Sequence, residues 1–82
     1  MSKTYRKVVS HQAEKFLRKQ SNQIQKRVVE SIHGLPMDGD VKKLKGSMFY
    51  RLRVGNMRVV FEIDHLEKMI FIQTIDYRGD IY

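Results

Sequence analysis

The sequence predicts a two-layer α+β domain in which one strand is followed by two helices and then by three strands. Apolar residues recur at helical spacing in the first part of the chain, and from residue 49 onward Val, Ile, Phe and Tyr gather in strand-like runs. A Gly-Asn pair between two of these runs is typical of a tight hairpin turn. With 82 residues the chain has room for one core, and so for a single domain, 1–82.

The N-terminal part predicts a strand over residues 5–9 and a helix after it. Aromatic and β-branched residues in 5–9 favour an extended chain. Ser10 can then cap a helix. The apolar residues Ala13, Phe16 and Leu17 have the i, i+3, i+4 spacing of one helical face.

A second helix is predicted to begin at Ser21 and Asn22 and to end near residue 33. Gln25 stands three residues after Asn22, in capping-box position. Apolar residues then repeat at four-residue spacing: Ile24, Val28 and Ile32. Gly34 is a good left-handed terminator and Pro36 prevents continuation of the helix. The two helices should form a helical hairpin.

Residues 37–46 are expected to form a basic loop, because turn-forming residues lie at both ends and Leu44 is a lone apolar residue among lysines. Three strands are expected after it, over residues 49–54, 57–64 and 68–75. The sequence therefore predicts four strands in all.

The turn at Gly55 and Asn56 fixes the register of the hairpin on either side of it. Pairing runs outward from Val54 opposite Met57. One face of the hairpin is then entirely apolar and should pack on the helices; it is formed by Tyr50, Leu52, Val54, Met57, Val59 and Phe61.

The other face of the hairpin collects arginines. Arg53 lies directly opposite Arg58, and Arg51 lies opposite Val60. Like charges directly opposite each other destabilise a sheet by up to about 1 kcal/mol, so a bound anion explains what stability does not. The guanidinium fork suits bidentate binding of phosphate. The alternative is a solubilising face whose arginines pair with Glu62 and nearby acids.

The charge of the chain is concentrated as well as large. Sixteen Lys and Arg against nine Asp and Glu give a formal charge of +7 and a pI of about 9.9. These values suit a polyanionic partner, although a merely soluble basic protein can share them. Between Asp40 and Glu62 no residue is acidic, whereas six are basic: Lys42, Lys43, Lys45, Arg51, Arg53 and Arg58. Such a one-sign block favours a phosphate-binding surface.

Several other kinds of site are disfavoured. The chain has no cysteine for disulfides or thiolate zinc sites, which fits a reducing cytoplasm. Its longest apolar run, 69–72, is far too short for a secretion signal or a membrane span. The three histidines, His11, His33 and His65, lack metal-ligand spacing, and no Gly-rich phosphate loop or nucleophile elbow is present. We therefore expect no metal and no cofactor.

The chain end offers two further candidates, Arg78 and Tyr82. Gly79 allows the backbone to turn, so that Tyr82 can fold back toward the sheet. A hydrophobic cover or a frayed terminus is the alternative for Tyr82, and Arg78 alone is unremarkable.

Two segments resemble the RelE family of toxin–antitoxin ribonucleases: KKLKGSMFYRLRVGNMRVVFEID over residues 42–64 and YRGDIY over residues 77–82. The alternating YRLRVG, the RVVFEI strand and the terminal Arg and Tyr occur in order at family spacing. The resemblance implies two N-terminal helices packed on a mainly antiparallel four-stranded sheet. It also implies a cytoplasmic toxin that cleaves mRNA in the ribosomal A site, inhibits translation and is neutralised by an antitoxin.

Carried over residue by residue, the family's functional positions fall on Arg51, Arg53, Arg58, Arg78 and Tyr82. A basic loop that contacts ribosomal RNA in such enzymes is matched by Lys42, Lys43 and Lys45. Well-known members carry lysines where this chain has Arg51 and Arg53. Because arginine is effectively never deprotonated, neither residue is a credible general base, and the identity of the base stays open. Met57 replaces a usual tyrosine and is expected to change packing only.

The resemblance implies that a 2′-hydroxyl attacks its adjacent phosphate without a metal ion. We expect the hairpin arginines to stabilise the phosphate, Arg78 to neutralise the leaving side or orient the base, and Tyr82 to stack on or deprotonate the substrate. The expected partners are the ribosome, mRNA and an acidic RelB-like antitoxin, with a monomeric free toxin and no membrane.

Two alternatives stand beside the ribonuclease. A ParE-like toxin shares the fold but poisons DNA gyrase without cleaving RNA. A non-enzymatic RNA-binding module would keep the salt-sensitive affinity and release no product. The basic cluster and Tyr82 favour the ribonuclease, since the ParE branch generally lacks them. Codon preference and the fold of the antitoxin cannot be derived from the sequence.

Overall fold

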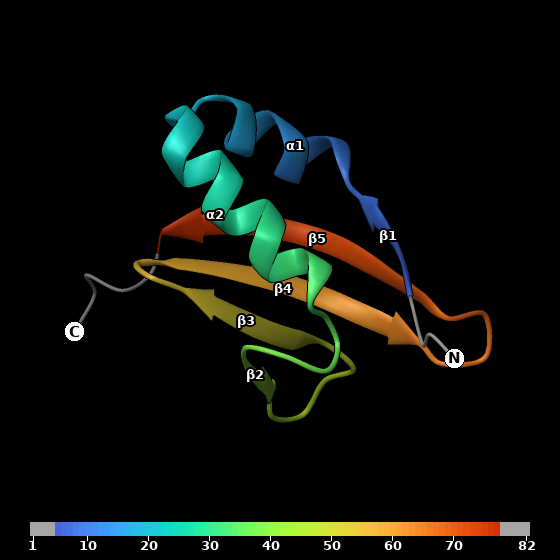
Figure 1. The fold of residues 1–82 in the computed structure, drawn as a ribbon. Coiled ribbons are helices and arrows are strands. Elements are labelled where there is room, and N and C mark those ends of the chain that lie inside the picture. Colours follow the sequence, from blue (N-terminus) through green and yellow to red (C-terminus); the bar gives the residue numbers. More distant parts are fainter. Residues whose placement is uncertain (1–4, 78–82) are drawn as a thin grey trace.

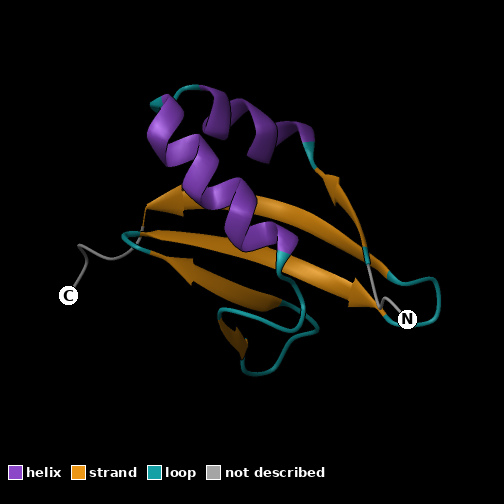
Figure 2. Ribbon diagram, viewed as in Figure 1, coloured by secondary structure: helices purple, strands orange, loops and turns teal. Residues whose placement is uncertain are grey.

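Two helices cover one face of a five-stranded sheet in the computed structural model, which describes residues 5–77. The elements are β1 (Arg6–Val9), α1 (His11–Arg18), α2 (Asn22–His33), β2 (Asp40–Lys43), β3 (Tyr50–Val54), β4 (Met57–Asp64) and β5 (Met69–Tyr77). Both helices lie on the same side of the sheet, and the opposite side carries no helix of the described chain (Figures 1 and 2). The α+β class is confirmed.

The strand order is β1-β5-β4-β3-β2. β1 pairs with β5 in parallel, and the other three pairings are antiparallel, so the expectation of a mainly antiparallel sheet is confirmed. No helix within residues 5–77 is long and apolar enough to cross a membrane.

The predicted count of four strands is wrong, because residues 40–43 of the expected loop form the edge strand β2. Val41 pairs with Leu52 and is half-buried, and Lys42 lies opposite Arg51. A strand of four residues with one apolar side chain carries too little alternation to be recognised in the sequence. Its lysines suit an edge, where charge discourages pairing with another chain.

The helices begin at serine caps. Ser10 Oγ accepts a hydrogen bond from the backbone N of Ala13 at 3.0 Å, and Ser21 Oγ accepts one from Ile24 N at 3.2 Å. The expected capping box is wrong, because Gln25 Nε2 donates instead to the carbonyl oxygen of Gln20 at 2.8 Å. That bond ties α2 to the short connection from α1.

α2 ends at His33 as expected, but Gly34 is not in the left-handed conformation, since its φ is −79°. The glycine is needed for space instead. A Cβ at this position would lie 3.0 Å from Cβ of Asp38, which is closer than ordinary packing allows. Gly34 therefore lets the chain fold tightly between α2 and β2.

The core lies between the helices and the apolar face of the hairpin. The hairpin register is confirmed at every predicted pair, from Val54 opposite Met57 to Tyr50 opposite Phe61. Leu52, Val59 and Phe61 are at most 1% exposed. Burial of each such side chain contributes about 1.5–3 kcal/mol, so this face is firmly held against the helices. The residues between these core positions are forced onto the helix-free side.

Candidate phosphate-binding face

Four cationic side chains from three neighbouring strands share the helix-free side of the sheet. Arg53 is directly opposite Arg58 across β3 and β4, as the sequence predicted. Arg51 is opposite Lys42 across β3 and β2, so the strand that had been expected as a loop brings a lysine into the same group. Lys42, Arg51, Arg53 and Arg58 are here called the arginine face.

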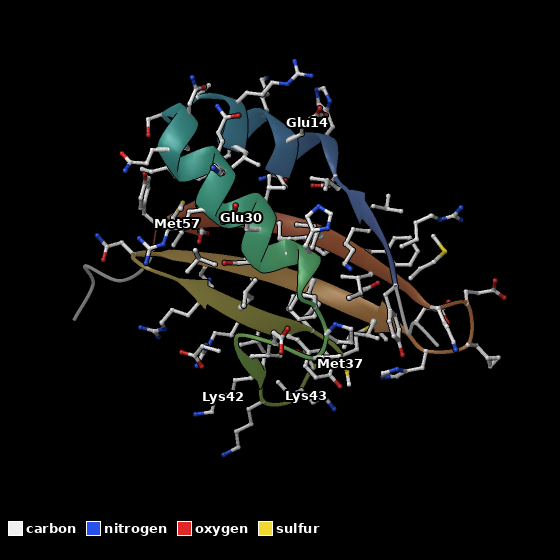
Figure 3. All side chains as sticks on the ribbon, in the orientation of Figure 1. Glu14, Glu30, Met37, Lys42, Lys43 and Met57 are labelled. Carbon is white, nitrogen blue, oxygen red and sulfur yellow. The ribbon has the colours of Figure 1, made fainter. Side chains whose placement is uncertain are left out.

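The other two predicted lysines do not join this face. Lys43 is opposite Tyr50, whose ring packs on Phe61 in the core, so Lys43 belongs to the other side of β2. Lys45 is exposed in the turn that follows. Figure 3 labels Lys42 and Lys43 on β2, at the edge of the sheet. Lys43 and Lys45 together are here called the basic edge, which lies beside the arginine face.

Arg51 is held by one carboxylate. Its Nη1 lies 3.4 Å from Oδ1 of Asp40 and donates a hydrogen bond to the carbonyl oxygen of Asp40 at 3.1 Å. The Arg51 side chain is only 15% exposed, whereas the Asp40 side chain is 61% exposed. Arg51 is thus an oriented cation, and the side chain of its carboxylate partner is largely exposed to solvent.

Arg58 has a carboxylate neighbour that the sequence analysis missed. Asp76 lies directly opposite it on β5, with 4.0 Å between Arg58 Nε and Asp76 Oδ1. This distance is too long for a hydrogen bond. Both atoms are buried, and neither has a hydrogen-bond partner within the described chain. The pair attracts by charge alone and leaves the donor and the acceptor unsatisfied.

A β-bulge in β5 brings Asp76 opposite Arg58. Phe61 pairs with Ile72 but Val60 pairs with Thr74, so Gln73 is the extra residue. Arg53 is exposed and lies opposite Asp40 on β2, but the Asp40 carboxylate pairs with Arg51, and no described carboxylate lies within ion-pair distance of Arg53. The arginine face therefore keeps excess positive charge despite two acidic neighbours.

Two predictions from the sequence remain, the two residues at the chain end and the absence of a metal site. Arg78 and Tyr82 lie outside the described residues. Residues 5–77 contain no group of three metal-ligating side chains. The arrangement offers several guanidinium donors to one anion, because β-strands hold the bases of their side chains at fixed spacing.

Comparison with known proteins adds a family to this geometry. No protein-family model matches the chain, and no curated protein matches it by sequence. Solved structures do match. The RelE–RelB complex from Pyrococcus horikoshii OT3 has a TM-score of 0.79 and 28% identity, covering 94% of this chain and 98% of that one. The RelB–RelE antitoxin–toxin complex from Methanococcus jannaschii has a TM-score of 0.72 and 28% identity, covering 92% and 94%.

This chain is similar to RelE toxins in fold and over nearly its whole length. The isolated E. coli RelE toxin also shares the fold, with a TM-score of 0.68 at 20% identity, covering 95% of this chain and 90% of that one. The RelE-like chain is matched over nearly its full length, so the two helices and the sheet with its arginine face all fall within the shared fold.

Proposed function

We propose that this RelE-like toxin is a ribosome-dependent endoribonuclease, which cleaves mRNA in the ribosomal A site and is neutralised by a RelB-like antitoxin. The observation that carries the proposal is Arg53 set directly against Arg58 on the helix-free side, with Arg51 and Lys42 alongside. The repulsion between opposed cations destabilises the free protein. An RNA phosphate bound between them removes this repulsion and accepts hydrogen bonds from both guanidinium groups. The solved RelE–RelB complexes support the antitoxin partner.

The chemistry that suits this face is attack by a 2′-hydroxyl on its own phosphate. The O2′–P bond forms while the P–O5′ bond breaks, the 2′-hydroxyl gives its proton to a base, and the departing 5′ oxygen takes up a proton from solvent. Arg51, Arg53 and Arg58 stabilise the negative charge that grows on the phosphorane oxygens. The products are a 2′,3′-cyclic phosphate and a 5′-hydroxyl, and the scheme uses no metal ion.

The arginine face is stronger in charge stabilisation than in proton transfer. Arginine cannot act as a base at neutral pH, and no histidine lies on the strands of this face. Arg78 is proposed to neutralise the leaving side or to orient the base, and Tyr82 to stack on or deprotonate the substrate. We therefore assign part of the orientation of the 2′-hydroxyl to the ribosome.

Ribosome dependence gives the first prediction. Cleavage of A-site mRNA in programmed ribosomes should exceed cleavage of the same naked RNA by orders of magnitude, because orientation alone contributes about 7–11 kcal/mol in favourable cases. Arg58→Ala should lose activity on ribosomes, and the fragments should carry 5′-hydroxyl ends.

Single-turnover assays with end mapping measure both. Equal cutting of naked and ribosome-bound RNA would contradict the dependence on the ribosome. Toxicity without RNA ends, accompanied by stalled DNA gyrase, would replace the proposal with a gyrase poison.

A further inference from the structure

The proposed reaction needs a proton acceptor beside the arginines, and the helix-free side offers few. Its carboxylates within the described chain are Asp40, Glu62, Asp64 and Asp76. Asp40 lies opposite Arg53 on β2, but its carboxylate is engaged by Arg51, and Asp64 accepts a hydrogen bond from the backbone N of Glu67 at 3.0 Å. Glu62 lies farther along β4, opposite Phe71. Among these four carboxylates, Asp76 is the one that lies directly opposite Arg58.

Asp76 is positioned but not satisfied. Its Oδ1 is buried, lies 4.0 Å from Arg58 Nε and accepts no hydrogen bond from the described residues. Buried polar atoms in folded proteins nearly always have a partner, so an orphaned acceptor and an orphaned donor side by side are unusual. The Asp76 side chain as a whole is 42% exposed, which leaves it within reach of a ligand.

Space for a ligand lies next to Asp76, at the outer edge of β5. β1 pairs with β5 only as far as Ile72, and Ser10 Oγ then donates to the carbonyl oxygen of Gln73 at 2.7 Å as the chain turns into α1. Beyond this point no described strand covers that edge. The hollow left there measures about 370 Å³ and is here called the edge pocket.

The lining of the edge pocket combines cations and hydrogen-bonding groups with the apolar Phe16 and Ile75. Lys15, Lys19 and Gln12 reach it from α1, and Thr74 and Asp76 reach it from β5. The lysines supply charge for a phosphate, while the amide and the hydroxyl supply hydrogen bonds for a ribose or a base. Asp76 is thus shared between this pocket and the arginine face.

We propose that Asp76 is the general base of this toxin and that the ribonucleotide bearing the attacking 2′-hydroxyl occupies the edge pocket. This inference rests on the proposed function. With the scissile phosphate bound to Arg58, the carboxylate takes the 2′-hydroxyl proton and becomes the neutral acid. The freed O2′ attacks phosphorus, the P–O5′ bond breaks, and the 5′ oxygen takes a proton from solvent. Asp76 thereby supplies the acceptor that Arg51 and Arg53 cannot.

The charged groups that face Asp76 are all cationic. Arg58 lies opposite on β4, Arg53 lies beyond it on β3, and Lys15 and Lys19 approach from α1. No second carboxylate of the described residues shares this position, so the proton of the 2′-hydroxyl has one acceptor there.

The test is single-turnover cleavage of mRNA in programmed ribosomes by Asp76→Asn. This change keeps the shape of the side chain and removes its basicity. We expect the rate to fall by about a hundred-fold to ten-thousand-fold while ribosome binding stays unchanged. Asp76→Glu should restore part of the rate. Asp64→Asn is the matched control, because it makes the same change on the same face away from Arg58 and should cleave at the wild-type rate.

The pH profile separates a base from a residue that merely positions Arg58. A carboxylate base gives a rate that is flat from about pH 6 to 8, whereas Asp76→Asn, left with hydroxide as the base, should rise tenfold per pH unit. Cleavage by Asp76→Asn at the wild-type rate would overturn the inference. A wild-type rate that itself rises tenfold per pH unit would also overturn it and favour Tyr82. If the wild type cleaves no ribosome-bound mRNA, it is the proposed function that fails.

Discussion

Arg53 faces Arg58 across the hairpin and has no described carboxylate within ion-pair distance. Each arginine is anchored on a strand whose other side is buried, so the backbone positions of the two stay directly opposite each other. In a protein selected only for stability, one of them would be replaced. The opposed Arg53 and Arg58 therefore indicate that these positions serve ligand binding and lower the stability of the fold.

Arg53→Gln should make the toxin more stable and less active. Removing the opposed charge is expected to raise the free energy of unfolding by about 0.2–1 kcal/mol, while cleavage on the ribosome falls. Urea unfolding and single-turnover cleavage measure the two effects. Arg18→Gln is the control, because it removes an arginine that pairs with Glu14 at 3.0 Å on the exposed side of α1. That variant should lose at most about 0.5 kcal/mol and keep its activity. A destabilised Arg53→Gln would contradict the argument.

Asp76 shows where derivation from the sequence stops. If β4 and β5 kept the register they have near their turn, where Asp64 pairs with Met69, Arg58 would lie opposite Ile75. The extra residue at Gln73 shifts the pairing by one and brings Asp76 to Arg58 instead. A shift of one residue exchanges the two faces of a strand, and no local signal in the sequence marks this bulge.

At the scale of elements, the β3–β4 hairpin was predictable because its register is set locally. A two-residue turn leaves one way to pair the flanking strands, so Gly55 and Asn56 determined the whole arginine pairing. Gly55 has a φ of +58°, which favours glycine. The edge strand β2 was missed for the opposite reason. Six residues, 44–49, separate it from β3, so no short-range turn rule fixes the pairing of the two strands.

Gly55→Ala should reduce cleavage activity on ribosomes by more than its loss of folding stability accounts for. A side chain at φ +58° costs about 1–2 kcal/mol, and the new Cβ would meet Arg27 Nη1 at 3.2 Å. Because that contact is the end of a flexible side chain, Arg27 can move away. Gly46→Ala is the matched control, with φ +74° and no atom within 4 Å of the new Cβ.

Both alanine variants should lose similar stability in urea unfolding. Only Gly55→Ala should also lose cleavage activity on ribosomes, because its turn aligns Arg53 with Arg58. Equal activity of the two variants would show that the alignment of the arginines is unimportant.

At the scale of the whole molecule, charge is divided between two tasks. The arginine face and Asp76 lie where the chemistry is proposed, whereas Lys43 and Lys45 lie at the basic edge, on the other side of β2 and in the turn after it. The formal charge of +7 attracts the molecule to a polyanion. Because the basic residues are concentrated on one part of the surface, the same attraction also orients the molecule as it binds.

The double variant Lys43→Gln/Lys45→Gln should therefore separate association from cleavage. Loss of two phosphate contacts lowers the slope of log affinity against log salt by about 0.7–0.9 for each lysine, so binding to ribosomes weakens most at low salt. The single-turnover rate at saturating toxin should stay at the wild-type value, since neither lysine reaches the arginine face. Lys42→Gln, one residue away but paired with Arg51 on that face, should lower the saturated rate as well. Rates measured over a range of salt and toxin concentrations distinguish the two variants, and an equal loss of the saturated rate in both would show that the basic edge belongs to the catalytic site.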